Sequence, residues 1–159
     1  MRILVVDDDE TLRFTLSSNL ESMGHVCLTA YDGKNAVDLV QKNQNEIDLI
    51  FLDINMPRLS GLEALCEIKK IDSKPFCVML TAYADIKDAV YAIKQGAYDY
   101  IEKPIHRESL KNILYQIDNT LELVTEVGFS APKIFFSEEK SMIGHSSEMA
   151  KVYKIIEKL

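Results

Sequence analysis

The sequence predicts an α/β domain built on a doubly wound, five-stranded parallel sheet. Three continuous apolar runs, ILVV at 3–6, LIFL at 49–52 and CVML at 77–80, are each too short to be a helix. Such runs are typical of strands that are buried on both faces of a parallel sheet. Segments with helical spacing of apolar residues alternate with them, which is the pattern of a sheet covered by helices.

Two further strand candidates mix polar with apolar residues. They are HVCLTA at 25–30 and YDYIE at 98–102, and their mixed composition is typical of edge strands. If these two strands lie at the edges and the three apolar runs lie inside, the strand order 2-1-3-4-5 fits. In a sheet with this order, ligands bind beyond the carboxyl ends of strands one and three, where the winding direction reverses.

The segments between the strands carry apolar residues at the spacing of amphipathic helices. The apolar faces consist of Leu12, Leu16, Leu20 and Met23 in the first helix, Leu62, Leu65 and Ile68 in a later one, and Ile86, Ala89, Val90 and Ile93 in the next. Gly24 and Gly96 follow two of these helices, where a left-handed C-terminal cap is favoured. The alternation of strands and helices predicts one domain over residues 1–122.

Composition and charge exclude several classes of function. The net charge of −7 is unsuited to a broad electrostatic contact with nucleic acid or an anionic membrane. No apolar run reaches membrane-spanning length, and Met1 lies too close to the first strand for a signal peptide. We therefore expect a cytoplasmic protein with no membrane partner, in which the cysteines Cys27, Cys66 and Cys77 are buried, reduced side chains.

Carboxylates gather at the predicted switch point of the sheet. Residues 7–9 (DDD) directly follow the first strand, and Asp53 ends the third. Carboxylates held together need a countercharge, and hard oxygen ligands suit Mg²⁺ or Mn²⁺. Thr81 and Lys103 follow the fourth and fifth strands, so that a hydroxyl and an ammonium group would lie near the metal. This combination is suited to the stabilisation of a phosphoryl group in transfer.

The chain resembles the response regulator receiver domains of two-component signalling, which have a flavodoxin-like fold. The resemblance covers residues 1 to 122 and is carried by four motifs in order, VVDDDE (5–10), FLDINMPRLSGLEAL (51–65), MLTAYAD (79–85) and GAYDYIEKPI (96–105). It implies that Asp53 accepts a phosphoryl group from a histidine kinase. It also implies that Asp8 and Asp53 bind Mg²⁺ directly, that Asp7 binds it through water and that the backbone carbonyl of Asn55 completes the protein ligands.

The resemblance further assigns roles to residues at the ends of the last strands. Thr81 would hydrogen-bond a phosphoryl oxygen, Lys103 would form an ion pair with it, and the Lys103–Pro104 bond would be cis. Tyr100 would be a switch residue that moves inward together with Thr81. Asp9 is predicted to cap the first helix instead of binding metal, because aspartate is a favoured N-cap residue.

Other functions remain open at this stage. An electron carrier of the flavodoxin type shares the strand order but would need a phosphate-binding loop where this chain has aspartates. An aspartyl-phosphate hydrolase usually has a second aspartate two residues after the nucleophile, where this chain has Asn55. A stand-alone receiver that acts through protein contacts, or one that signals without phosphate, would retain the fold.

The last helix of the domain contains a heptad pattern that extends beyond the sheet. Within RESLKNILYQIDNTLELVTEV (107–127), apolar residues repeat at intervals of four and three, which is typical of a coiled coil. We expect a homodimer through this helix. The predicted seam consists of Leu114, Ile117, Leu121 and Val124.

The remaining residues predict a longer regulatory protein. Gly128 and Pro132 interrupt the helix, so residues 123–140 are expected to form a helical extension and linker. MIGHSSEMAKVYKIIEKL (142–159) resembles the opening of the AAA+ ATPase domain of sigma-54-dependent activators of the nitrogen-regulator type. Residues 141–159 would thus begin a truncated AAA+ domain. The phosphate-binding motif of an ATPase is absent from the chain, so contacts with sigma-54 RNA polymerase and DNA would require further domains, and the chain itself is not expected to be an enzyme.

Overall fold

A computed structural model describes residues 1–127, so the predictions for 128–159 lie outside the described residues. Five parallel strands form one sheet in the order β2-β1-β3-β4-β5, as predicted. The strands are β1 (Arg2–Val6), β2 (Val26–Ala30), β3 (Leu49–Asp53), β4 (Phe76–Thr81) and β5 (Asp99–Glu102). The helices are α1 (Glu10–Ser22), α2 (Gly33–Lys42), α3 (Gly61–Ile71), α4 (Ile86–Lys94) and α5 (Arg107–Val127).

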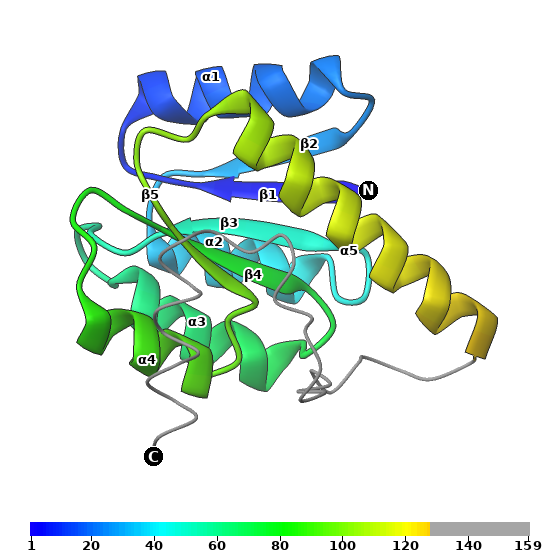
Figure 1. Cartoon of the computed structure of the whole chain (residues 1–159). Coiled ribbons are helices and arrows are strands. Elements are labelled where there is room, and N and C mark those ends of the chain that lie inside the picture. The colour runs from blue at the N-terminus through cyan, green and yellow to red at the C-terminus, as the bar shows by residue number, and fades with distance from the viewer. Residues whose placement is uncertain (128–159) are drawn as a thin grey trace.

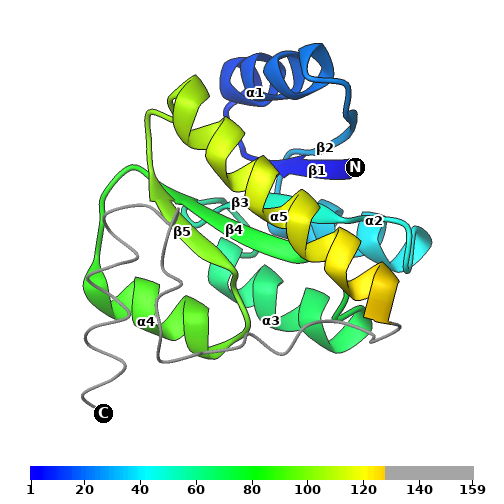
Figure 2. The ribbon, with the colours of Figure 1, turned by 45° about the vertical axis from the view of Figure 1, so that its right-hand side comes forward.

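The helices cover both faces of the sheet (Figures 1 and 2). Helices α1 and α5 pack on one face against a cluster that includes Ile3, Val5 and Phe51. Helices α2, α3 and α4 pack on the other face against a second cluster that includes Leu4 and Leu52. Alternate residues of each interior strand thus enter opposite cores, which is why these strands are apolar throughout.

The two edge strands differ in their burial. Val26 of β2 is 61% exposed, and the other β2 side chains before Ala30 are at most half-buried. In β5, by contrast, Tyr100 is 1% exposed and Ile101 is 5% exposed. The mixed composition therefore located both edges correctly, while helix packing around β5 buries that edge strand more fully than its polar residues indicate.

Local signals at the helix ends agree with the sequence. Asp9 caps α1 by accepting a hydrogen bond from the backbone N–H of Leu12 at 3.1 Å, as predicted. Gly24 and Gly96 have φ of 90° and 99°, the left-handed conformation that favours glycine after a helix. Asp9 thus sets where α1 begins, and Gly24 and Gly96 set where α1 and α4 end.

The prediction that the cysteines are buried holds for Cys77, whereas Cys27 and Cys66 are only partly buried. Burial raises the pKa of Cys27 to about 11 and also raises the pKa of the fully buried Cys77, so both remain thiols. Cys66 is only half-buried, and its sulfur lies 3.6 Å from Tyr91 Oη and 3.5 Å from Gln95 Oε1. Its surroundings are polar because the side chain faces the hydroxyl of Tyr91 and the amide of Gln95.

The packing of helix α5 contradicts two of the four residues of the predicted dimer seam. Leu114 and Ile117 are 4% and 0% exposed and belong to the core beneath α1 and α5. They are already covered by their own domain, so they are unavailable to a second chain. Leu121 packs partly on the same core, Val124 is half-buried, and the last turns of α5 extend beyond the sheet (Figure 1).

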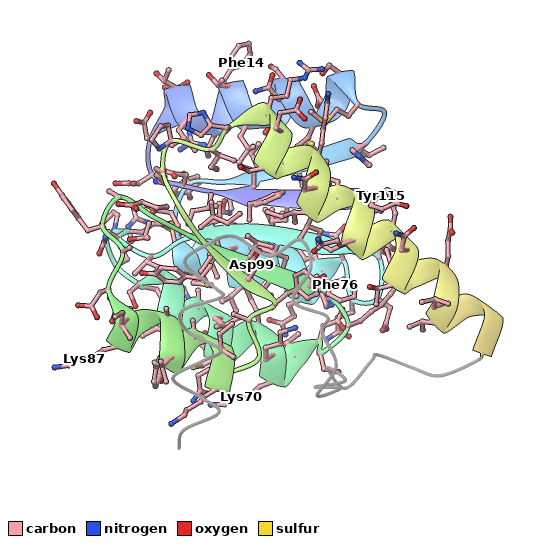
Figure 3. All side chains as sticks on the ribbon, viewed as in Figure 1. Phe14, Lys70, Phe76, Lys87, Asp99 and Tyr115 are labelled. Atoms are coloured by element: carbon pink, nitrogen blue, oxygen red, sulfur yellow. The ribbon has the colours of Figure 1, made fainter. Side chains whose placement is uncertain are left out.

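Some large apolar residues are exposed on the outer surfaces of α1, α4 and α5. Phe14 is 72% exposed and points away from the sheet at the outer side of α1 (Figure 3). None of the helices within residues 1–127 combines the length and the hydropathy that a membrane span requires.

Replacement of Ile117 by alanine tests the assignment of this residue to the core. We expect Ile117→Ala to lower the free energy of unfolding by about 2–5 kcal/mol, because it leaves a cavity in a close-packed region. Leu123→Ala is the matched control, since Leu123 lies on the same helix and is 61% exposed. Urea unfolding followed by circular dichroism measures both, and equal small losses would contradict the assignment.

Candidate functional site

Three carboxylates meet at the carboxyl edge of the sheet. Strands β1 and β3 are adjacent in the sheet, and their ends place Asp7, Asp8 and Asp53 beside one another. One carboxylate oxygen from each residue lies within 4.8 Å of the others. Asp7 and Asp53 are 0% and 3% exposed, whereas Asp8 is exposed. The cluster is therefore buried at Asp7 and Asp53 and accessible to solvent at Asp8.

The ammonium group of Lys103 lies between the two buried carboxylates. Its Nζ donates to Asp7 Oδ2 at 2.6 Å and lies 3.0 Å from Asp53 Oδ1. Lys103 follows β5 and is fixed by its backbone N–H, which donates to the carbonyl of Thr81 at 2.7 Å. The Lys103–Pro104 bond is cis, as predicted. The end of β5 thus places the Lys103 ammonium group beside the carboxylates that follow β1 and end β3.

The donor set fits a hard divalent cation. Among residues 1–127, Lys103 is the one side-chain cation in an ion pair with this cluster, so three carboxylates face a single ammonium group. Oxygen ligands with surplus negative charge and one open side are what Mg²⁺ uses in proteins. Asn55 lies just after β3 and is exposed, and its part in metal binding remains a prediction.

Burial and the neighbouring charges change the protonation of the site. The pKa of Asp53 is raised to about 6, chiefly by burial and also by the negative charges of Asp7 and Asp8, while the hydrogen bond and charge of Lys103 oppose the rise. For Lys103, burial alone would lower the pKa, but the hydrogen bonds and charges of Asp7 and Asp53 outweigh it and raise the pKa. Without metal, Lys103 is therefore charged at neutral pH and Asp53 is ionised at a cost.

The backbone around Asp7 is fixed by two contacts. The N–H of Asp9 donates to Asp7 Oδ1 at 2.9 Å, and the guanidinium of Arg13 donates to the carbonyl of Asp7 at 2.7 Å. The sequence motifs did not indicate the role of Arg13, since an arginine in the first turns of a helix is common. Asp7 is therefore held in place from both its side chain and its carbonyl.

Thr81 is next to the cluster but is bonded elsewhere. Its hydroxyl donates to the carbonyl of Tyr83 at 2.7 Å and accepts from the N–H of Tyr83 at 3.1 Å. Tyr100 is buried, and its hydroxyl accepts from the N–H of Asp85 at 3.4 Å. The structure therefore links both predicted switch residues to the loop between β4 and α4, with Tyr100 on the inside.

The loop between β3 and α3 fits tightly against the site. A Cβ on Gly61 would lie 2.0 Å from the carbonyl oxygen of Asp53, so only glycine allows this approach. Further along the loop, Arg58 forms an ion pair with the buried Asp32 at 3.2 Å. The sequence gives no signal for this pair, because its members lie in loops that follow different strands.

The raised pKa of Asp53 predicts how stability depends on pH. Between about pH 4 and 6 the folded protein retains a proton that the unfolded chain has released, so the ionised Asp53 destabilises the fold above that range. We expect Asp53→Asn to be more stable than the wild type at pH 7.5 without metal, by about 1–3 kcal/mol, and the gain to vanish by about pH 4.

Thermal unfolding at several pH values in the presence of chelator measures this difference. The control is Asp38→Asn, which removes an exposed carboxylate from α2 and should leave the stability unchanged. A destabilised Asp53→Asn at pH 7.5 would contradict the prediction.

Comparison with known proteins agrees with this geometry. Residues 3–115 match the response regulator receiver domain family. The two-component response regulator ARR10 of Arabidopsis thaliana is 35% identical over 113 residues, which are 71% of this chain and 20% of that protein. The chain spans between 19% and 49% of the length of the first curated relatives.

Two crystal structures are also similar to this chain in fold and sequence. NtrX from Brucella abortus in complex with ATP aligns with a TM-score of 0.71 and 33% identity, over 99% of this chain and 34% of that one. The CheX–CheY–BeF3–Mg complex of Borrelia burgdorferi aligns with a TM-score of 0.71 and 27% identity, over 74% of this chain and 89% of that one.

The family match spans the whole sheet and the three acids of the cluster. This match excludes the electron-carrier alternative. It also favours phosphoryl chemistry on a carboxylate of the protein over the alternative of a hydrolase that turns over a small-molecule substrate. The chain belongs to the response regulator receiver domain family and is a phosphorylation switch with an acidic site at Asp7, Asp8 and Asp53.

Proposed function

We propose that Asp53 accepts a phosphoryl group from a sensor histidine kinase, with Mg²⁺ held by Asp7, Asp8, Asp53 and the backbone carbonyl of Asn55. The observation that carries the proposal is the buried Asp53 carboxylate, which faces two further aspartates and lies 3.0 Å from Lys103 Nζ. The bound ion would neutralise charge on the aspartates and on the phosphoryl oxygens.

The residues of the chain orient and stabilise the transfer. One carboxylate oxygen of Asp53 bonds to phosphorus while the bond from phosphorus to the donor breaks and its electron pair leaves with the donor. Lys103 then pairs with a phosphoryl oxygen in place of the Asp53 carboxylate, and its contact with Asp7 keeps it in position. The buried surroundings strengthen these charge interactions because they exclude water.

The conformational switch would start at Thr81. To reach a phosphoryl oxygen, its hydroxyl must leave the backbone of Tyr83, to which it bonds twice. That exchange would shift the loop between β4 and α4, which also contacts the hydroxyl of Tyr100 through Asp85. The phosphoryl group would favour the shifted loop because only that conformation gives Thr81 its new partner.

The output would be a transcription activator that depends on sigma-54. The support is the resemblance of residues 141–159 to the opening of an AAA+ domain, together with the alignment of NtrX over 99% of this chain. We place the receiver at 1–122 and the helical extension and linker at 123–140. Polymerase and DNA would be contacted by further domains, in the cytoplasm.

A homodimer through the end of α5 would connect the switch to this output. Leu121 and Val124 are the two predicted seam residues that are not fully buried in their own domain. They lie three residues apart, on one side of the helix. This short seam would act together with other contacts of the dimer.

Acetyl phosphate with Mg²⁺ should add one phosphoryl group to the wild-type protein and none to Asp53→Asn. Intact mass spectrometry measures the adduct. Lys103→Met should reduce the yield of adduct strongly, because it removes the partner of the phosphoryl oxygens. Lys87→Met is the control, since Lys87 extends outward from α4 (Figure 3). An adduct that persists in Asp53→Asn would contradict the assignment of the phosphoacceptor.

Val124→Lys should shift the protein from dimer to monomer, because it places a charge in the seam. Leu123→Lys adds the same charge at a position that is already 61% exposed and should leave the dimer intact. Size-exclusion chromatography with light scattering measures both, with and without phosphate. A monomeric wild type would refute this part of the proposal.

A further inference from the structure

The loop at residues 54–60 connects the phosphoacceptor strand to α3 and carries Asn55. Its two ends meet, because the N–H of Gly61 donates to the carbonyl of Ile54 at 2.9 Å. Ser60 caps α3 through a reciprocal pair of hydrogen bonds with Glu63. These contacts hold the ends of the loop, so the position of its middle depends on what the middle touches.

The middle of the loop touches the start of α2 through an ion pair. Arg58 Nη1 lies 3.2 Å from Asp32 Oδ2, and the Asp32 side chain is 2% exposed. The other oxygen of Asp32 accepts from the N–H of Asn35 at 2.7 Å and caps α2. Oδ2 makes no hydrogen bond within the described part of the chain. The guanidinium therefore supplies the countercharge for a buried carboxylate.

The backbone of Arg58 shows that this contact is maintained at a cost. Its φ is 70°, a conformation that residues other than glycine rarely adopt. The guanidinium also lies 6.0 Å from the ring centroid of Tyr31, which precedes Asp32. An unfavourable backbone conformation persists where surrounding contacts impose it.

A second contact joins the same two loops. A Cβ on Gly33 would lie 2.5 Å from the carbonyl oxygen of Leu59. The backbones after β2 and after β3 therefore approach each other closely, directly next to the ion pair. Together these contacts join the loop to the first turn of α2, which packs in the core.

The geometry points to Arg58 as a positioning residue for the metal site, acting through Asp32 to hold the loop that carries Asn55. This inference rests on the proposed Mg²⁺ site. Arg58 lies three residues after Asn55 and five after Asp53, and it does not itself belong to the carboxylate cluster. Without the ion pair, the middle of the loop would keep only the close approach of Leu59 to Gly33 as its contact with α2, and the metal ligands at its start would be less well ordered.

Charge and positioning predict opposite effects on metal affinity. Arg58 is a cation near a cation site, so its removal by electrostatics alone would strengthen the binding of Mg²⁺ or leave it unchanged. Loss of positioning would weaken the binding. The sign of the change therefore distinguishes the two roles.

Isothermal titration calorimetry with MgCl₂ measures the effect. We expect Arg58→Met to raise the Mg²⁺ Kd about three- to tenfold, since contacts behind metal ligands commonly tune affinity on this scale. Asp32→Asn should raise it similarly, because asparagine retains the helix cap and loses the charge. The double variant should be no weaker than the worse single variant, and Arg58→Lys should recover part of the affinity.

The matched control is Lys34→Met, which removes an exposed cation from the first turn of α2 without touching the ion pair. It should leave Mg²⁺ affinity unchanged or slightly stronger. Hydrogen exchange without metal provides a second measurement, in which residues 54–60 of Arg58→Met should exchange faster than in the wild type.

The outcomes separate this inference from the proposal on which it rests. A wild-type protein that binds no Mg²⁺ would overturn the metal site itself. Wild-type binding with unchanged or stronger affinity in Arg58→Met, or unchanged exchange in the loop, would overturn the positioning role.

Discussion

The contact of Lys103 with Asp7 and Asp53 is the interaction on which the site depends. Two ionised carboxylates that are almost fully buried repel each other and lose their hydration, so a fold that places them together must supply an opposite charge. The ammonium group at 2.6 and 3.0 Å supplies part of it. It neutralises only one charge, and the raised pKa of Asp53 shows that the compensation is incomplete.

This incomplete compensation makes the site responsive to ligands. A fully neutralised cluster would have little to gain from a divalent cation, and an uncompensated one would strongly favour protonation. With one ammonium for three carboxylates, the domain can fold without a metal, and a bound divalent cation would supply the remaining countercharge. The parallel sheet makes the arrangement possible, because β1, β3 and β5 end at the same edge.

The sequence predicts most of this architecture because the deciding signals are local. Short apolar runs mark the interior strands, and Asp9, Gly24 and Gly96 mark helix ends through the conformations they favour. The site acids could be predicted because all parallel strands end at one edge. Sequence alone could not predict that Leu114 and Ile117 face their own core, since a heptad and an amphipathic helix have nearly the same period.

The contacts that link distant loops are the least predictable from sequence. The pair of Arg58 and Asp32 joins residues 26 positions apart in loops with no periodic pattern. The polar surroundings of Cys66 likewise depend on how α3 and α4 pack. The hydroxyl of Thr81 has several partners within its reach, so only the folded loop decides that it bonds to Tyr83.

The length of α5 has a mechanical consequence. The helix is continuous from Arg107 to Val127, and Ile117, near its middle, is fully buried. At 1.5 Å per residue, the turns after Ile117 form a rigid arm of about 15 Å. A tilt of about 10° at the core would therefore move the end of the arm by about 2.6 Å. A small change in packing beneath α5 would in this way become a larger displacement at the end of the helix.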